Sequence, residues 1–278
     1  PSTGLVMKAP GQKVSRPEYW EKNMRIYRYK YQKKCSYGIL EGDVLFPVQG
    51  SIFRKFKVEK QGVPLGRVLL LPPVLPSKIV AVGRNYRAHA VERGSPVPKK
   101  PLLFLKPPSA VIGPHDSIVY PDMAGRVDFE GELAVVMKKR ASRLSKGADV
   151  ASYILGYTCF NDVTARDLQD KDGQWTRAKS FDTFAPLGPC IATDLDPSRL
   201  ILKTFLNGKL RQSGNTRNFI FPVPFLLYYI SQIMSLEPGD VVTTGTPSGI
   251  GPMNPGDRVD VQIEGIGTLS NTVMRVKP

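Results

Sequence analysis

Residues 128–136 read DFEGELAVV, two glutamates one position apart at the start of an apolar run. Side chains alternate between the two faces of a β-strand, so Glu130 and Glu132 point to the same face, roughly 6–7 Å apart. Burying two unpaired carboxylates is costly. A divalent cation with Asp162 as third ligand removes that cost, and oxygen ligands favour Mg²⁺, Mn²⁺ or Ca²⁺ over zinc. The alternative is an ion pair between one glutamate and an arginine or lysine.

The same run indicates the fold class. Ala134 and Val136 share the face of the glutamates, while Leu133 and Val135 occupy the other, so both faces are apolar. A strand of this kind belongs in the interior of a fold. The chain also carries 25 glycines and 25 prolines, which predict many turns and short strands. We therefore expect a mainly β protein with some α-helix.

Three parts follow from the pattern along the chain. Residues 1–23 are expected to be a loose extension, residues 24–73 a small β-rich unit, and residues 78–278 the main domain. Strands are predicted over 25–33, 37–40, 44–48, 78–82, 102–105, 241–244 and 258–263. A short helix or ordered loop is predicted over 88–93. From residue 128 onward we expect short strands and turns, with one late helix over 224–233 that is opened by a proline in its first turn.

The charge balance raises one alternative function. The formal net charge is +15, and Tyr27, Tyr29 and Tyr31 alternate with cationic residues. Aromatic side chains between cations suit the stacking of nucleic-acid bases. The same alternation suits a half-buried strand with a polar outer face, which we favour because the basic residues are spread along the whole chain.

Cysteine usage and hydropathy bear on the compartment. The chain has 3 cysteines without a CxxC pair, which favours a reducing compartment and hence the cytoplasm. The acid-poor first 23 residues leave a transit peptide, and thus the mitochondrial matrix of a eukaryote, as the alternative. No apolar run approaches the length of a membrane-spanning helix, so we expect no membrane partner.

Further residues carry chemistry. His89 and Glu92 are i, i+3 neighbours on a predicted helical turn, where the carboxylate raises imidazole basicity and suits a base that activates water. Lys179, among apolar neighbours, suits a partly buried cation that stabilises an enolate, unless it is a surface lysine. The loop 243–249 offers backbone N–H groups to a carboxylate. Asp162 suits a helix N-cap as well as a metal, and His115 lies in a turn.

Six motifs occur in one order. They are GRNY at 83–86 with His89 and Glu92, FLKP at 104–107, EGEL at 130–133, DVTARD at 162–167 with Gln169, KSFD at 179–182 and GTP at 245–247. Together they resemble the fumarylacetoacetate hydrolase family over residues 78–275, and among its subgroups the acylpyruvate hydrolases and oxaloacetate decarboxylases. Residues 24–73 are similar to the small N-terminal unit of many prokaryotic members.

The resemblance implies a mixed β-sandwich roll, a homodimer, and one Mg²⁺ or Mn²⁺ per subunit, for which Ca²⁺ can substitute. It implies metal ligation by Glu130, Glu132 and Asp162. It gives catalytic roles to His89 and Glu92, on a lid, and to Lys179. It implies substrate binding by Arg84, Asn85, Gln169, Gly245 and Thr246.

The implied substrate is a small 2-oxo or diketo acid. The implied reactions are cleavage of a C–C bond in an acylpyruvate and decarboxylation of oxaloacetate, both through a metal-stabilised pyruvate enolate. Alternatives are an isomerase or decarboxylase of an aromatic catabolic pathway and a hydrolase of diketo-deoxy sugar acids. A nucleic-acid-binding module is the distant alternative.

Overall fold

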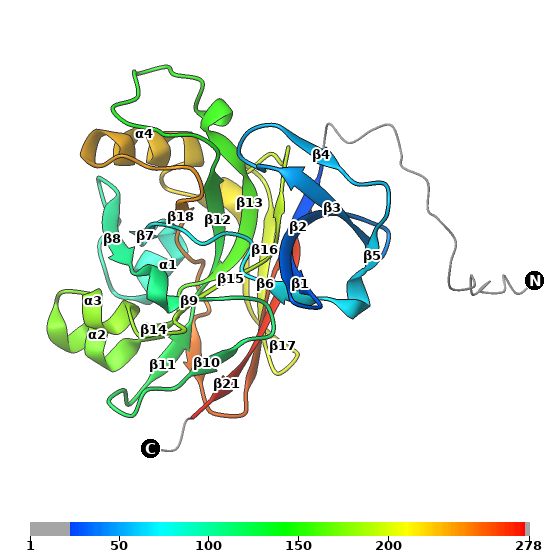
Figure 1. The fold of residues 1–278 in the computed structure, drawn as a ribbon. Helices are drawn as coiled ribbons and strands as arrows, with labels where there is room; N and C mark the ends of the chain where they lie inside the picture. The colour runs from blue at the N-terminus through cyan, green and yellow to red at the C-terminus, as the bar shows by residue number, and fades with distance from the viewer. Residues whose placement is uncertain (1–22, 276–278) are drawn as a thin grey trace, which may run out of the picture.

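A computed structural model of the chain describes residues 23–275, so the predicted extension lies almost entirely outside the described residues. The described part is mainly β with few helices, as predicted (Figure 1). Within it, no helix is long and apolar enough to cross a membrane.

One large mixed sheet organises the chain, and its strands follow the spatial order β4-β3-β2-β1-β15-β13-β12-β18-β7-β8. Their bounds, in that order, are Phe56–Val58, Val44–Gly50, Lys34–Glu41, Arg25–Tyr31, Ala185–Ala192, Ile154–Asn161, Gly131–Met137, Val241–Thr243, Ile79–Gly83 and Leu102–Lys106. Three short strands attach beside this path: β5 (Val63–Pro64), β6 (Leu69–Leu71) and β9 (Val111–Ile112).

A second sheet packs on the middle of the first. Its order is β10-β21-β20-β16-β17, with bounds Ser117–Val119, Gly267–Met274, Arg258–Ile263, Ile201–Leu206 and Lys209–Asn215. Buried residues of β12 such as Leu133 and Val135 lie in one apolar cluster with Leu202, Val261 and Leu269 of the second sheet. The core is therefore a layer between two sheets, as in a β-sandwich. A small third sheet joins β14 (Thr164–Ala165), β11 (Val127–Phe129) and β19 (Gly251–Met253).

The glycine between the two glutamates is explained by this packing. A Cβ at Gly131 would lie 2.1 Å from the Thr204 Oγ1 atom of β16, so no larger residue fits there. Because side chains alternate, Gly131 faces the second sheet while Glu130 and Glu132 face away from it. All seven residues of β12 are buried, which confirms the interior strand predicted from the sequence.

The N-terminal unit continues the main sheet. Strand β1 pairs with β15 through Arg25↔Ala192 and Ile26↔Ile191. Tyr27 and Tyr29 of β1 are only 7% and 2% exposed. The half-buried strand is therefore confirmed for these residues, and neither ring is available to stack a nucleic-acid base.

Four α-helices lie among the described residues, and two of them were predicted. These are α1 (Arg87–Glu92) and α4 (Val223–Ile233). The expectation of strands and turns alone after residue 128 and before the late helix was wrong, because α2 (Arg166–Asp172) and α3 (Thr176–Lys179) lie there. Their sequences are polar and short, so they lack the apolar period that identifies a helix. Figure 1 shows α1, α2 and α3 on the side of the fold away from β2–β5.

Candidate metal centre and active-site pocket

Two adjacent strands bring the three predicted carboxylates together. Glu130 and Glu132 flank the first residue of β12, and Asp162 follows the last residue of β13. The antiparallel pair Gly131↔Asn161 sets these positions side by side, and the Asp162 N–H donates to the Glu130 carbonyl oxygen at 2.8 Å. One carboxylate oxygen from each lies within 4.8 Å of the others, and all three residues are buried.

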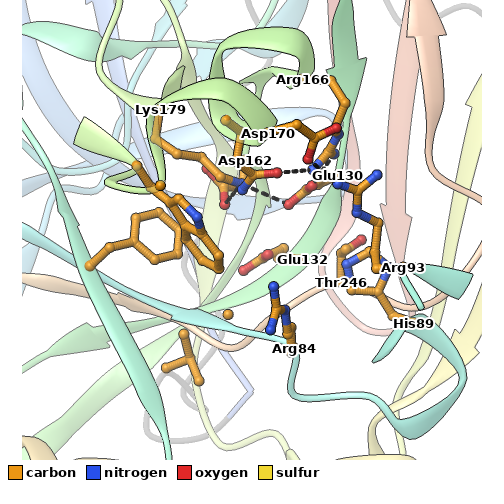
Figure 2. Close-up of a pocket in the computed structure, with 16 residues that line it drawn as sticks. Arg84, His89, Arg93, Glu130, Glu132, Asp162, Arg166, Asp170, Lys179 and Thr246 are labelled. Carbon is orange, nitrogen blue, oxygen red and sulfur yellow. Dashed lines mark hydrogen bonds and ion pairs between the residues drawn. The ribbon is translucent and has the colours of Figure 1, made fainter. Parts of the chain in front are cut away.

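Cations compensate two of these carboxylates. Lys179 Nζ lies 2.9 Å from Glu130 Oε2 and 2.6 Å from Asp162 Oδ2 (Figure 2). Arg166 also pairs with Glu130. Burial favours the neutral form of Glu130, but Lys179 and Arg166 outweigh it and hold the pKa of that carboxyl well below its usual range. The ion-pair alternative drawn from the sequence therefore describes Glu130 in this structure.

Lys179 is itself kept charged by the same contacts. It is 2% exposed, which excludes the surface-lysine alternative. Burial favours the neutral amine, but Asp162 and Glu130 outweigh it and raise the pKa of Lys179. The pocket therefore presents a fixed positive charge beside the three carboxylates.

Glu132 differs from its two neighbours. Its Oε2 accepts the Gly245 N–H at 2.8 Å, but no cation pairs with it among residues 23–275. Burial, and then repulsion from Asp162 and Glu130, raise the pKa of Glu132 well above its usual range. An ion with two positive charges would remove this repulsion. The donor set of three buried carboxylates therefore fits a hard divalent cation.

Asp162 does not cap a helix. Helix α2 begins after Ala165, and no side chain accepts a capping hydrogen bond there. Both Asp162 carboxylate oxygens instead accept from lysines, since Lys106 Nζ lies 2.6 Å from Oδ1. The capping alternative was therefore wrong.

The carboxylates line a cavity of about 260 Å³. His89 lines it too, and its Nδ1 lies 2.9 Å from Glu92 Oε2, so the predicted neighbours on α1 are confirmed. The other Glu92 oxygen accepts the Gly249 N–H at 2.8 Å. These contacts hold α1 against the loop that follows β18, with His89 at the edge of the cavity near Thr246 (Figure 2).

Three of the five predicted substrate-binding residues also line the cavity, namely Arg84, Gln169 and Thr246. Gln169 Oε1 accepts from Arg166 at 2.5 Å. Thr246 Oγ1 donates to the Gly131 carbonyl oxygen and accepts from Gln212. The side chains of Gln169 and Thr246 are thus held in place by hydrogen bonds within the protein.

The other two lie just outside the cavity lining. The Asn85 side chain is fully buried, and its amide nitrogen donates to the carbonyl oxygens of Phe221 and Thr244. Its Oδ1 accepts the Phe221 N–H. The Gly245 N–H is occupied by Glu132. In this structure both residues position the cavity walls, and direct substrate contact would require these bonds to break.

The sequence reasoning missed several residues of the site. Lys106 is 1% exposed, and burial, opposed by Asp162, lowers its pKa. Arg166 joins Glu130 to Asp128 of β11, and Arg93 of the α1 end pairs with Asp170 of α2. Trp175 forms part of the cavity wall. Lys106 and Arg166 carried a signal, since they lie in the motifs at 104–107 and 162–167 and Lys106 directly follows the apolar run 102–105.

Comparison with known families assigns both parts of the chain. Residues 78–274 match the family model described as fumarylacetoacetate (FAA) hydrolase C-terminal. Residues 24–73 match a model described as Rv2993c-like, N-terminal.

Relatives of the chain differ in the reactions that their names give. Oxaloacetate tautomerase YisK of Bacillus subtilis is 43% identical over 225 residues, which cover 75% of this chain and 74% of that protein. The structure of 5-carboxymethyl-2-hydroxymuconate delta-isomerase from Mycobacterium smegmatis is 44% identical, with a TM-score of 0.85, and covers 91% of this chain and 100% of that one. Maleylpyruvate hydrolase of Sphingobium sp. SYK-6, solved with manganese(II) and pyruvate, is 30% identical with a TM-score of 0.76 and the same coverage.

Proposed function

The chain belongs to the fumarylacetoacetate hydrolase family, and from that premise we propose that it is a divalent-metal-dependent enzyme that forms the enolate of a small 2-oxo acid. One observation carries the proposal: the buried carboxylates Glu130, Glu132 and Asp162 share a cavity with the cation of Lys179 and with His89, whose imidazole pairs with Glu92. These are the parts that enolate chemistry requires, namely an electrophilic end, a counter-charge and a base.

The three carboxylates would hold Mg²⁺ or Mn²⁺, which supplies a Lewis acid to the 2-oxo carboxylate end of the substrate when bound. Lys179 supports the negative charge that develops on the enolate oxygen, since its ammonium group is buried and stays protonated. The pairs with Glu130 and Asp162 fix its position before substrate arrives. Preorganised charges of this kind need no reorientation during the reaction.

His89 is proposed to move the proton. Its Nδ1 faces Glu92, which leaves Nε2 for the substrate. The imidazole takes a proton from C3 of the 2-oxo acid, which leaves the enolate, and the imidazolium then gives that proton to the oxygen on C2, so the atoms balance without another reactant. The Gly249 N–H orients Glu92 and thereby the ring.

We propose keto–enol tautomerisation of oxaloacetate as the first reaction to test. The observation that favours it is the similarity to oxaloacetate tautomerase YisK over three quarters of the chain. Tautomerisation needs only the base and the stabilised enolate described above.

Hydrolysis of an acylpyruvate, with decarboxylation of oxaloacetate, is the second candidate. The His89–Glu92 pair also suits the activation of water, and the likeness to maleylpyruvate hydrolase supports it. Both reactions release or form the same type of enolate, so one site can serve them.

The test follows the enol absorbance of oxaloacetate, and pyruvate release from oxaloacetate and from acetylpyruvate, with Mg²⁺, with Mn²⁺ and with EDTA. Metal alone is the blank, because free metal ions catalyse both changes. Faster enol loss without pyruvate supports tautomerisation, and pyruvate from acetylpyruvate supports hydrolysis. If no enzyme-dependent rate appears with any pair of metal and substrate, the proposal is wrong.

The division of the chain into units and its oligomeric state are part of the same proposal. We propose that residues 24–73 and 78–278 are the two units of the protein, supported by the ranges of the two family matches. We also propose a homodimer, which light scattering of the purified protein tests directly.

A further inference from the structure

Arg84 differs from the other cations of the cavity. The other arginine and lysine side chains that line it pair with carboxylates: Arg93 with Asp170, Arg166 with Asp128 and Glu130, and Lys179 with Glu130 and Asp162. Among residues 23–275, Arg84 has neither an ion pair nor a side-chain hydrogen bond. A positive charge without a counter-charge in a polar cavity favours an anionic ligand.

The backbone holds Arg84 in an uncommon conformation. Its φ is +58°, in the left-handed region that non-glycine residues rarely adopt. The three side-chain hydrogen bonds of Asn85 fix the next residue to the segments at 221 and 244. Strain of this kind persists where the surrounding structure imposes it, and it concentrates at ligand-binding sites.

An aromatic ring orients the guanidinium. Arg84 Cζ lies 5.7 Å from the centroid of the Trp175 ring. That ring packs directly on Gly83, where a Cβ would lie 2.7 Å from the Trp175 Cζ3 atom. This cation–π contact uses none of the guanidinium N–H donors, which stay free to bind a carboxylate in a fork.

The two cationic ends of the cavity lie along one aromatic wall. Phe104 contacts Trp175 edge to face at 5.2 Å, and Lys179 Nζ lies 5.1 Å from the Phe104 centroid. Lys179 therefore lies at the Phe104 side and Arg84 at the Trp175 side. In the view of Figure 2, the Arg84 guanidinium points toward the carboxylates from the side opposite to Lys179.

We propose that Arg84 binds a second carboxylate of the substrate, so that the site selects 2-oxo dicarboxylic acids over monocarboxylic acids with the same 2-oxo end. This assignment rests on the proposed function for the end of the substrate that lies beside Lys179 and the three carboxylates. It makes Arg84 a specificity-determining residue whose role is the recognition of the distal anion. The proton transfer itself stays with His89.

The test compares two stable ligands that differ by one carboxylate. Malate and 2-hydroxybutyrate are the hydroxy analogues of oxaloacetate and 2-oxobutyrate, and their binding to the Mg²⁺-loaded protein is measured by calorimetry. Three variants are compared with the unmodified chain: Arg84→Gln, Arg84→Lys and, as matched control, Arg87→Gln. Arg87 is exposed on α1 and lines a neighbouring groove rather than this cavity.

The unmodified protein and the Arg87→Gln variant should bind malate about tenfold or more tighter than 2-hydroxybutyrate, the scale of one charge-assisted carboxylate contact. Arg84→Gln should remove that preference by weakening the binding of malate alone, with the Kd of 2-hydroxybutyrate changed less than about threefold. Arg84→Lys should retain part of the preference, because it keeps the charge but loses the fork. The ratio of kcat/KM for oxaloacetate and 2-oxobutyrate should move in parallel.

An equal loss of affinity for both ligands in Arg84→Gln would show that Arg84 only shapes the cavity, and it would overturn the inference. So would an unmodified protein that binds the two ligands equally or binds neither. Failure of the proposed function is a separate result. If the protein prefers malate through Arg84 but turns over neither oxaloacetate nor acetylpyruvate, the inference stands while the proposed reaction falls.

Discussion

Replacement of Glu132 by glutamine should stabilise the metal-free protein and abolish its response to metal. Glutamine has the same shape and can still accept the Gly245 N–H. It removes one buried charge that has no cationic partner among the described residues and that Asp162 and Glu130 repel. Removing an uncompensated buried charge should raise the free energy of unfolding by about 1–3 kcal/mol. For a chain of this size that corresponds to a rise of roughly 2–12 °C in Tm once Glu132 is ionised.

The pH dependence gives this prediction an internal control. The pKa of Glu132 is raised in the folded protein, so its contribution to stability is present below its unfolded-state pKa and is lost as pH rises through the folded value. The Glu132→Gln variant lacks this group. The two metal-free proteins should therefore unfold at similar temperatures in acid, and the variant should gain its advantage only as pH rises.

Bound metal should reverse which of the two proteins has the higher Tm. An ion present at about 100 times its Kd stabilises the folded state by about 2.7 kcal/mol, or roughly 5–11 °C here. The unmodified protein should show this shift with Mg²⁺ or Mn²⁺, and the variant should show little of it. Differential scanning fluorimetry with and without EDTA measures both effects, with the exposed Glu41→Gln variant as control. An equal metal shift in Glu132→Gln would refute the ligand assignment, and a metal-free variant whose Tm advantage does not grow as pH rises would refute the electrostatic argument.

Other variants test the remaining parts of the site. His89→Ala should lower the rate about 10²–10⁴-fold and keep the rise in Tm that metal causes. The same change at the exposed His115 should alter neither the rate nor that rise. Full activity of His89→Ala would return His89 to a structural role. Arg93→Ala should raise KM by up to about fivefold, since the partly exposed ion pair of Arg93 with Asp170 joins α1 to α2 and such pairs are worth at most about 1 kcal/mol. Exchanging the two charges should restore KM. An unchanged KM in the single variant would show that this ion pair does not contribute to substrate binding. Lys106→Met should cost about 3 kcal/mol of unfolding free energy, because it breaks a buried pair; a loss below about 1 kcal/mol in urea titrations would show that Lys179 alone compensates the carboxylate.

Local patterns settled much of the fold and part of the site. The period of two along β12 fixed the face of Glu132, whereas Glu130 lies between β11 and β12 and is also placed by the hydrogen bond from the Asp162 N–H to its carbonyl oxygen. The spacing of His89 and Glu92 fixed their contact in the same way, because i, i+3 neighbours meet on any helical turn. Short apolar runs between turn residues located six strands of the main sheet, namely β1, β2, β3, β7, β8 and β18, but only β20 of the second sheet.

The tertiary structure decided which charges meet. Lys106 lies on β8 and reaches Asp162 at the end of β13, and no local pattern encodes that contact. Arg84 and Trp175 are likewise joined only because β7 and the segment before α3 flank one cavity. The polar helix α2 forms without an apolar period, with Arg166 fixed by Asp128 and Glu130. Sequence periodicity thus determined the direction of each side chain relative to its own strand or helix. The partners of those side chains depended on contacts between distant segments, which form only when the sheets pack.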